Sequence, residues 1–98
     1  MKIKLNNRAR QKLLDILYEE EIKTLEGMDI LQWESKSRRH IWDTPEHFTR
    51  IYEISKYGML KEIDTRDYFD YEPPENAYVL LVEHENVFDS RKLWIYTK

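Results

Sequence analysis

AYVLLVEHENVFDSRKLWIYT, from Ala77 to Thr97, is the stretch of sequence that decides the fold. Its first part, residues 77–84, is an almost unbroken apolar run, which is typical of a strand in the middle of a sheet. Residues 92–97 form a second β-rich run, and residues 85–91 supply the connection between the two. Two such runs in succession favour an antiparallel hairpin. We therefore expect residues 77–84 to occupy a central position in an antiparallel sheet.

Upstream of this hairpin, residues 7–27 carry the pattern of a helix. Asparagine is a good N-cap and glycine a common helix terminator, so the helix is expected to begin after Asn6 or Asn7 and to end at Gly27. Apolar residues recur at helical spacing along one stripe, which consists of Leu14, Tyr18, Ile22 and Leu25, with Ala9, Leu13 and Leu17 beside it. This stripe is expected to pack on the sheet.

Residues 29–44, DILQWESKSRRHIWDT, favour a hairpin over a helix. With Lys36 and Ser37 in the turn, Leu31 would face Trp42 across the two strands. Lysine and serine do not readily adopt the positive φ angles of a two-residue turn, so the register of this hairpin stays open.

Residues 45–57 carry the signals of a second helix. Thr44 suits the N-cap and Pro45 the first helical position, where the missing N–H costs nothing. The inward stripe of this helix would consist of Phe48, Ile51, Tyr52 and Ser55, and Gly58 would end it. Two short strands, residues 2–5 and 59–64, complete the predicted elements.

These elements predict an α+β fold in which two helices pack on an antiparallel sheet of four to five strands. The alternative is a winged helix, in which residues 45–57 would be the recognition helix and the final hairpin the wing. A chain of 98 residues has room for one modest core. We expect residues 1–98 to form a single domain.

The composition excludes several classes of protein. Thirteen aromatic residues and an apolar share of 41% argue against disorder. The absence of cysteine excludes disulfides, thiolate metal sites and cysteine nucleophiles. No apolar run reaches the length of a signal peptide core or a membrane span, so we expect no contact with membranes and a cytoplasmic location.

Catalytic and cofactor motifs are missing from the sequence. The two glycines are isolated, which rules out a glycine-rich phosphate loop, and none of the serines stands in a nucleophile motif. The three histidines, His40, His47 and His84, do not have the spacing of metal ligands on a helix. We therefore predict that the protein is not an enzyme and has no metal site and no cofactor.

Charge is distributed in blocks along the chain, although the net charge is only −3. Residues 62–89 contain nine acidic residues and one basic residue, and they include RDYFDYEPPE, from Arg66 to Glu75. Tyrosine provides rigid contact area at protein interfaces, and carboxylates beside it would attract a basic partner. The docking hypothesis assigns the contacts to Asp67, Tyr68, Asp70, Tyr71 and Glu72. The alternative is a loop whose rings fold inward over the core and leave the acids in water.

The second charged block is basic. Residues 2–12 contain five basic residues and no acid. Lysine and arginine neutralise phosphates, so this block could bind nucleic acid together with the turn of the predicted hairpin. The candidate residues are Arg8, Arg10, Lys12, Arg38 and Arg39. Against this interpretation, a sequence pI of about 5.6 lies far below that of a dedicated DNA-binding domain.

The sequence thus predicts a small regulatory or inhibitory protein that binds a protein partner through the acidic, tyrosine-rich segment. The partner could itself be a nucleic-acid-binding protein, whose phosphate channel the carboxylates would occupy. The alternative is a regulator that binds nucleic acid directly, and a homodimer paired through the final strand stays open. Scarce alanine and glycine beside abundant isoleucine and lysine indicate an AT-rich gene, which is compatible with a phage or a mobile element.

Overall fold

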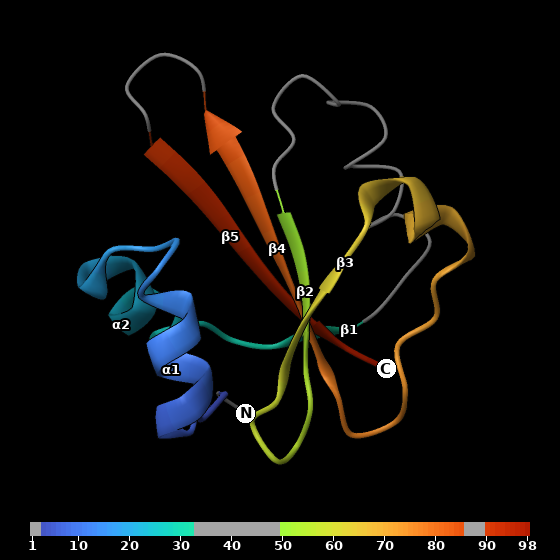
Figure 1. Ribbon diagram of the computed structural model, residues 1–98, viewed down its shortest axis with the longest axis horizontal. Helices are drawn as coiled ribbons and strands as arrows, with labels where there is room; N and C mark the ends of the chain where they lie inside the picture. The colour runs from blue at the N-terminus through green and yellow to red at the C-terminus, as the bar shows by residue number, and fades with distance from the viewer. Residues whose placement is uncertain (1–2, 33–49, 86–89) are drawn as a thin grey trace.

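A sheet of five strands with two helices on one face forms the body of the protein in the computed structural model, which describes residues 3–32, 50–85 and 90–98 (Figure 1). The helices are α1, Asn7–Leu13, and α2, Glu19–Gly27. The strands are β1, Leu31–Gln32; β2, Arg50–Ile54; β3, Leu60–Ile63; β4, Tyr78–Glu85; and β5, Ser90–Thr97. Their order is β1-β5-β4-β2-β3, and every pair is antiparallel except β1 with β5. The α+β class predicted from the sequence is confirmed.

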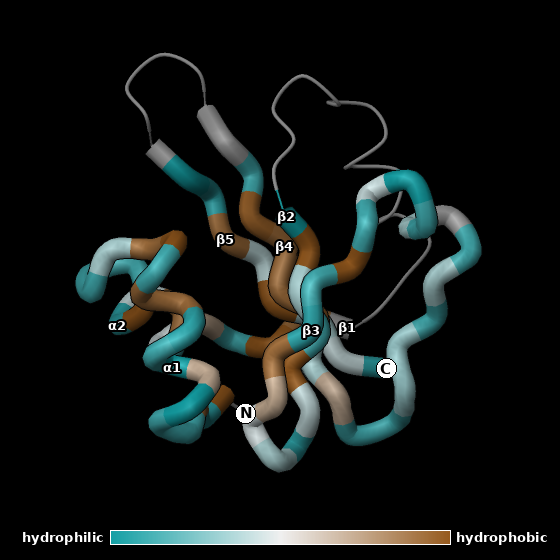
Figure 2. Tube along the Cα trace, in the orientation of Figure 1, coloured by the Kyte–Doolittle hydropathy of each residue, from teal (hydrophilic) through white to brown (hydrophobic). Residues whose placement is uncertain are grey.

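The β4–β5 hairpin is the centre of this sheet. Its register places Leu80 opposite Ile95 and Leu81 opposite Trp94. On its other side β4 pairs with β2, so β4 is flanked by a strand on each edge, as its continuous apolar run predicts. Figure 2 shows this middle of the sheet as the most hydrophobic part of the fold.

The first face of the sheet, which we call the helix face, is covered by α1 and α2. Side chains alternate along a strand, so Leu80 and Ile95 point to this face and meet Leu13, Ile22 and Leu25 from the helices. These five side chains are fully buried. Each contributes about 1.5–3 kcal/mol to folding by leaving water.

The second face is covered by a short 3-10 helix, Thr65–Asp70, and by the chain that follows it to Pro73. We call residues 65–73 the lid segment and this side of the sheet the lid face. Ile51, Val79 and Leu81 are fully buried beneath it and form a second apolar cluster. The helix face and the lid face therefore bury separate clusters on opposite sides of one sheet.

The predicted helix over residues 7–27 is wrong in one respect, because it is two helices. The Asn6 side chain does cap the first helix, accepting from the Ala9 N–H at 3.0 Å. The chain then turns at residues 14–17, and α2 begins after Tyr18, whose N–H donates to the Glu21 carboxylate at 2.8 Å. The break keeps Leu17 buried but leaves Tyr18 67% exposed. The predicted stripe is therefore buried only in its second half.

The predicted helix over residues 45–57 is also wrong where the structure describes it. Residues 50–54 form β2, in which Ile51 points to the lid face and Tyr52 to the helix face. Gly58 does not end a helix but lies in the turn between β2 and β3, with φ of +81°. A strand where the recognition helix would stand also makes the winged-helix alternative wrong. Thr44, Pro45 and Phe48 lie outside the described residues.

The remaining predictions concern the strands expected over residues 2–5, 29–44 and 59–64. Residues 3–5 form no strand, although Ile3 is buried in the cluster of the helix face. Leu31 and Gln32 do lie in a strand, but β1 pairs in parallel with Tyr96 and Thr97 of β5. Residues 33–44 of the predicted hairpin fall in the part of the chain that the structure does not describe. The strand predicted over residues 59–64 is confirmed as β3.

Candidate acidic docking surface

The lid segment owes its position to a turn at its start. Asp64 caps the 3-10 helix, because its carboxylate accepts from the Arg66 N–H at 2.9 Å. The Arg66 guanidinium also binds this carboxylate through two nitrogens, at 3.1 and 2.7 Å. The hydrogen bonds from the Arg66 side chain lower the pKa of Asp64 to about 2. Asp64 is therefore ionised at neutral pH and fixes where the segment leaves β3.

The two described rings of the segment point inward. Tyr68 is 4% exposed and belongs to the apolar cluster of the lid face with Ile51 and Leu81. Tyr71 is half-buried, and its hydroxyl donates to the Glu53 carboxylate on β2 at 2.6 Å. Burial raises the pKa of Tyr71, and the hydrogen bond to the Glu53 carboxylate raises it further. These two rings hold the segment on the sheet, as the core-lid alternative predicts.

This arrangement changes the part that Tyr68 can play in docking. A ring that is almost fully buried offers no contact area to a partner, so Tyr68 supports the surface from below. Truncating such a ring costs about 3–5 kcal/mol. Loss of binding in Tyr68→Ala would therefore report on folding. The side chain of Phe69 lies outside the described part of the structure.

The carboxylates of the segment point outward. Asp67, Asp70 and Glu72 are all exposed, as the docking hypothesis requires. Glu72 lies 3.4 Å from the Lys98 ammonium, in an ion pair whose side chains are both about half exposed. The Asp67 and Asp70 carboxylates form no hydrogen bond or ion pair with the described residues. Their charges are therefore available to a partner.

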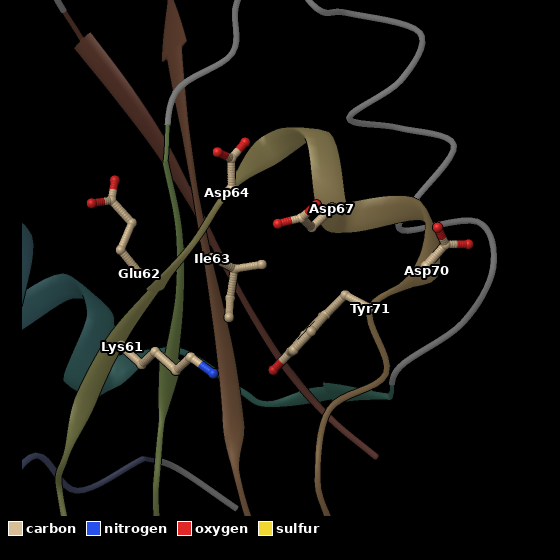
Figure 3. A pocket seen from close by; sticks show the side chains of 7 residues that line it. All are labelled: Lys61, Glu62, Ile63, Asp64, Asp67, Asp70 and Tyr71. Carbon is tan, nitrogen blue, oxygen red and sulfur yellow. The ribbon is translucent and has the colours of Figure 1, made fainter.

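Asp67 and Asp70 line a shallow hollow of about 320 Å³ between the lid segment and β3 (Figure 3). Its described lining consists of Lys61, Glu62, Ile63, Asp64, Asp67, Asp70 and Tyr71. In Figure 3, Lys61 and Tyr71 point toward one another across the hollow. Four of the seven residues are acidic, and Lys61 is the one base among them. We call Glu62, Asp64, Asp67, Asp70 and Glu72 the acidic surface.

Two members of this surface, Glu62 and Asp64, were missed as contacts by sequence reasoning. They come from β3 and its end, which the fold brings beside the lid segment. A signal was present in the sequence, because Asp64, Asp67 and Asp70 are spaced three residues apart. A 3-10 helix has three residues per turn, so this spacing places Asp67 and Asp70 one turn apart on the helix, with Asp64 at its N-cap.

The chemistry of the surface is that of a charged contact area. Among the described residues, no group of three carboxylate or histidine side chains is arranged to hold a metal ion. Asp64 is kept ionised by Arg66, which leaves it poorly suited to donate or accept a proton near neutral pH. Exposed carboxylates can attract and orient a basic partner.

The basic candidates lie on the other side of the sheet. Arg8 and Lys12 are exposed on α1, which packs on the helix face (Figure 1). Arg10 is bound to Glu26 of α2 in an ion pair, so its charge is partly neutralised. Arg38 and Arg39 lie outside the described residues. The structure thus separates α1 from the carboxylates of the lid segment by the thickness of the sheet.

Comparisons of the chain with models of protein families, with curated proteins and with solved structures found no match in any of the three. Within the described ranges, neither helix is long and apolar enough to cross a membrane.

Proposed function

We propose that this protein is a non-enzymatic binding module that docks on a basic surface of another protein through its acidic surface. The observation that carries the proposal is the lining of one open hollow, in which four of the described residues are acidic and a single one is a lysine. Complementary charge of this kind speeds encounter and selects among partners.

The rings support this function by holding the carboxylates in place. Tyr68 packs in the lid-face cluster, and Tyr71 is bonded to Glu53 below the segment. A surface that is already ordered loses less conformational entropy when it binds. The acidic surface is therefore pre-organised by contacts that the partner does not have to make.

The strongest contributors should be the carboxylates that form no ion pair within the described part of the chain. Arg66 offsets the charge of Asp64, and Lys98 offsets that of Glu72. Glu62, Asp67 and Asp70 form no ion pair with the described residues. We assign the main attraction for the partner to these three side chains.

The proposed partner is a protein with a patch of lysine and arginine, such as a protein that binds nucleic acid. Carboxylates that replace phosphates in its binding channel would make the module an inhibitor of that protein. A cytoplasmic setting and an origin in a phage or mobile element belong to this proposal.

The test is a comparison of two double variants in a pull-down from nuclease-treated lysate of the source cell. Asp67→Asn with Asp70→Asn neutralises two docking carboxylates, whereas Asp15→Asn with Glu20→Gln removes the same charge from exposed positions elsewhere. We expect the first pair to weaken capture of a defined protein about tenfold, because exposed ion pairs contribute about 0.2–1 kcal/mol each. Equal capture by both pairs would refute the proposal.

Direct binding of nucleic acid is the second candidate, favoured by one observation. The Asn6 side chain donates to the Tyr57 carbonyl, which fixes the β2–β3 turn beside the start of α1. The Tyr57 ring is 74% exposed and has the Lys56 ammonium 5.1 Å from its centroid, and Arg8 is exposed in the first turn of α1. Aromatic rings beside basic residues can stack with unpaired bases while the cations hold the phosphates.

This second candidate is tested with a fluorescently labelled single-stranded oligonucleotide. Tyr57→Leu should weaken binding several-fold, since base stacking contributes about 1–3 kcal/mol. Arg8→Gln should reduce the dependence of affinity on salt. Binding that is unchanged in both variants would exclude α1 and the β2–β3 turn as the interface.

A further inference from the structure

The outer edge of β3 is open within the described part of the chain. β3 is the last strand in the order of the sheet, and no described strand pairs with its second side. The Ser55 N–H donates to the Met59 carbonyl at 2.9 Å, which sets the register of the β2–β3 ladder. Backbone groups alternate in direction along an antiparallel strand. Those of Lys61 and Ile63 therefore point to β2, and those of Leu60 and Glu62 point to the open edge.

The surroundings of this edge are hollowed and acidic. A second shallow hollow, of about 410 Å³, is lined among the described residues by Glu62, Ile63, Asp64 and Thr65. It shares Glu62, Ile63 and Asp64 with the hollow of Figure 3. The open edge thus runs along the acidic surface, with space beside it.

We infer that the partner binds by adding an extended, lysine- or arginine-bearing segment to β3 as a further strand of the sheet. An extended chain can pair with the outward N–H and C=O groups of Leu60 and Glu62. Its alternate basic side chains would meet Glu62 on one face, and Asp67 and Asp70 on the other. This inference rests on the proposed function and specifies how the same surface is used.

The charges at this edge select the occupant. A second copy of the chain, paired through its own β3, would bring its Glu62 and Asp64 close to the same residues of the first copy. Like charges on adjacent strands are destabilising, so the edge disfavours self-pairing. Charged side chains and short length are common protections of sheet edges. Here they reject acidic and neutral strands while attracting a basic one.

The first experiment uses a synthetic peptide of alternating lysine and valine as the probe, with the intact protein. Hydrogen exchange of individual amides is followed by NMR with and without the peptide. We expect peptide binding to slow the exchange of the Leu60 and Glu62 amides about tenfold or more, because both become hydrogen-bonded. The Lys61 and Ile63 amides already point to β2 and serve as internal controls.

The second experiment compares this peptide with one of the same sequence in which every central residue is N-methylated. The methylated peptide keeps its charges but lacks the backbone donors, so we expect it to bind about tenfold more weakly. A peptide of alternating glutamate and valine should not bind.

The outcomes separate this inference from the proposed function. Equal binding of the methylated and unmethylated peptides, or binding that leaves the Leu60 and Glu62 amides unchanged, would overturn strand addition. Failure of the lysine–valine peptide to bind would overturn it as well. The proposed function would still stand in these cases if Asp67→Asn with Asp70→Asn weakened capture of the protein partner. Protection of the same amides at high protein concentration without peptide would instead identify a second copy as the occupant.

Discussion

The bond from Tyr71 to Glu53 is the contact on which the position of the acidic surface most depends, and its removal gives the sharpest prediction. Tyr71→Phe keeps the ring and its packing but removes the hydroxyl that donates at 2.6 Å. Hydrogen bonds to charged groups contribute about 1.5–3 kcal/mol when buried. Because Tyr71 and Glu53 are only half-buried, we expect the lower end of that range, a loss of about 1.5 kcal/mol in the free energy of unfolding.

The measurement is a double-mutant cycle in urea. The four proteins are the wild type, Tyr71→Phe, Glu53→Gln and the double variant, and the coupling energy should be about 1 kcal/mol or more. Tyr57→Phe is the matched control, because Tyr57 is 74% exposed and its loss of a hydroxyl should change stability by less than about 0.5 kcal/mol. A coupling energy of zero would refute the argument that this bond fastens the lid segment.

The same contact predicts how stability responds to alkaline pH. The pKa of Tyr71 is raised above its ordinary value of 10.0, so the folded protein keeps this proton where the unfolded chain has lost it. Its contribution to stability is full below pH 10 and decreases as the pH rises above that value. Tyr71→Phe should make the alkaline loss of stability smaller without abolishing it, since burial also raises the pKa of Tyr52. An unchanged pH profile in Tyr71→Phe would contradict this assignment.

Two further predictions concern the ends of β3. The Asp64 carboxyl should titrate near pH 2 in NMR spectra, and Arg66→Gln should return its pKa toward 3.8. Because the pKa of Asp64 is lowered in the folded state, its contribution to stability is present above pH 3.8 and is lost as the pH falls toward 2. Gly58→Ala should cost more than about 1 kcal/mol in thermal or urea unfolding, because φ is +81° and the new Cβ would overlap the Asn6 side chain. Gly27→Ala is the control, since a Cβ there meets nothing within 4 Å and alanine favours the helix.

The parts of the fold that could be predicted are those where one pattern excludes the others. The apolar run of residues 77–84 is too continuous for an amphipathic helix, and it is followed by a second run that can pair with it. The structure confirms both strands and the central position of the first. An asparagine just before an apolar stripe of helical spacing likewise indicates an N-cap, and Asn6 caps α1 as expected.

The prediction was wrong for residues 50–54 because the sequence of residues 50–57 fits both the helical period and the strand period. Ile51, Tyr52 and Ser55 can share one helix face, but Ile51 and Tyr52 can equally point to opposite faces of a strand. Gly58 suits the end of a helix and the tight turn of a hairpin alike. Pairing with both β3 and β4 decides in favour of the strand. That pairing joins residues far apart in the chain, which local patterns do not reveal.

The break at residues 14–18 has a different cause. Leu13 and Leu17 are both buried, and a continuous helix from residue 7 would carry Leu14 and Tyr18 onto the same inward stripe. The fold instead turns the chain and starts α2 with its own cap at Tyr18. Glu21 then reaches Arg91 of β5 at 2.6 Å, a contact that no pattern within residues 7–27 could predict.

For the acidic surface, both interpretations of the sequence required exposed carboxylates, and the structure confirms this for Asp67, Asp70 and Glu72. The sequence did not decide whether the rings of the lid segment point inward or outward. The missing step was the three-residue period of the lid segment. Tyr68 and Tyr71 are three residues apart, as are Asp67 and Asp70, so a 3-10 helix separates rings from acids. An alternation that looks like a mixed surface in the sequence becomes two distinct sides in the fold.

This separation gives the rings and the carboxylates different roles. The rings bind the sheet, so their substitution should change stability first and binding only as a consequence. The carboxylates face water, so neutralising Asp67 and Asp70 should leave stability within about 0.5 kcal/mol of the wild type while it weakens a basic partner. A protein that held its acids through flexible loops would show no such division, because ordering the loop and binding the partner would then occur together. The period of three residues in RDYFDYEPPE thus allows folding and docking to be altered independently of each other.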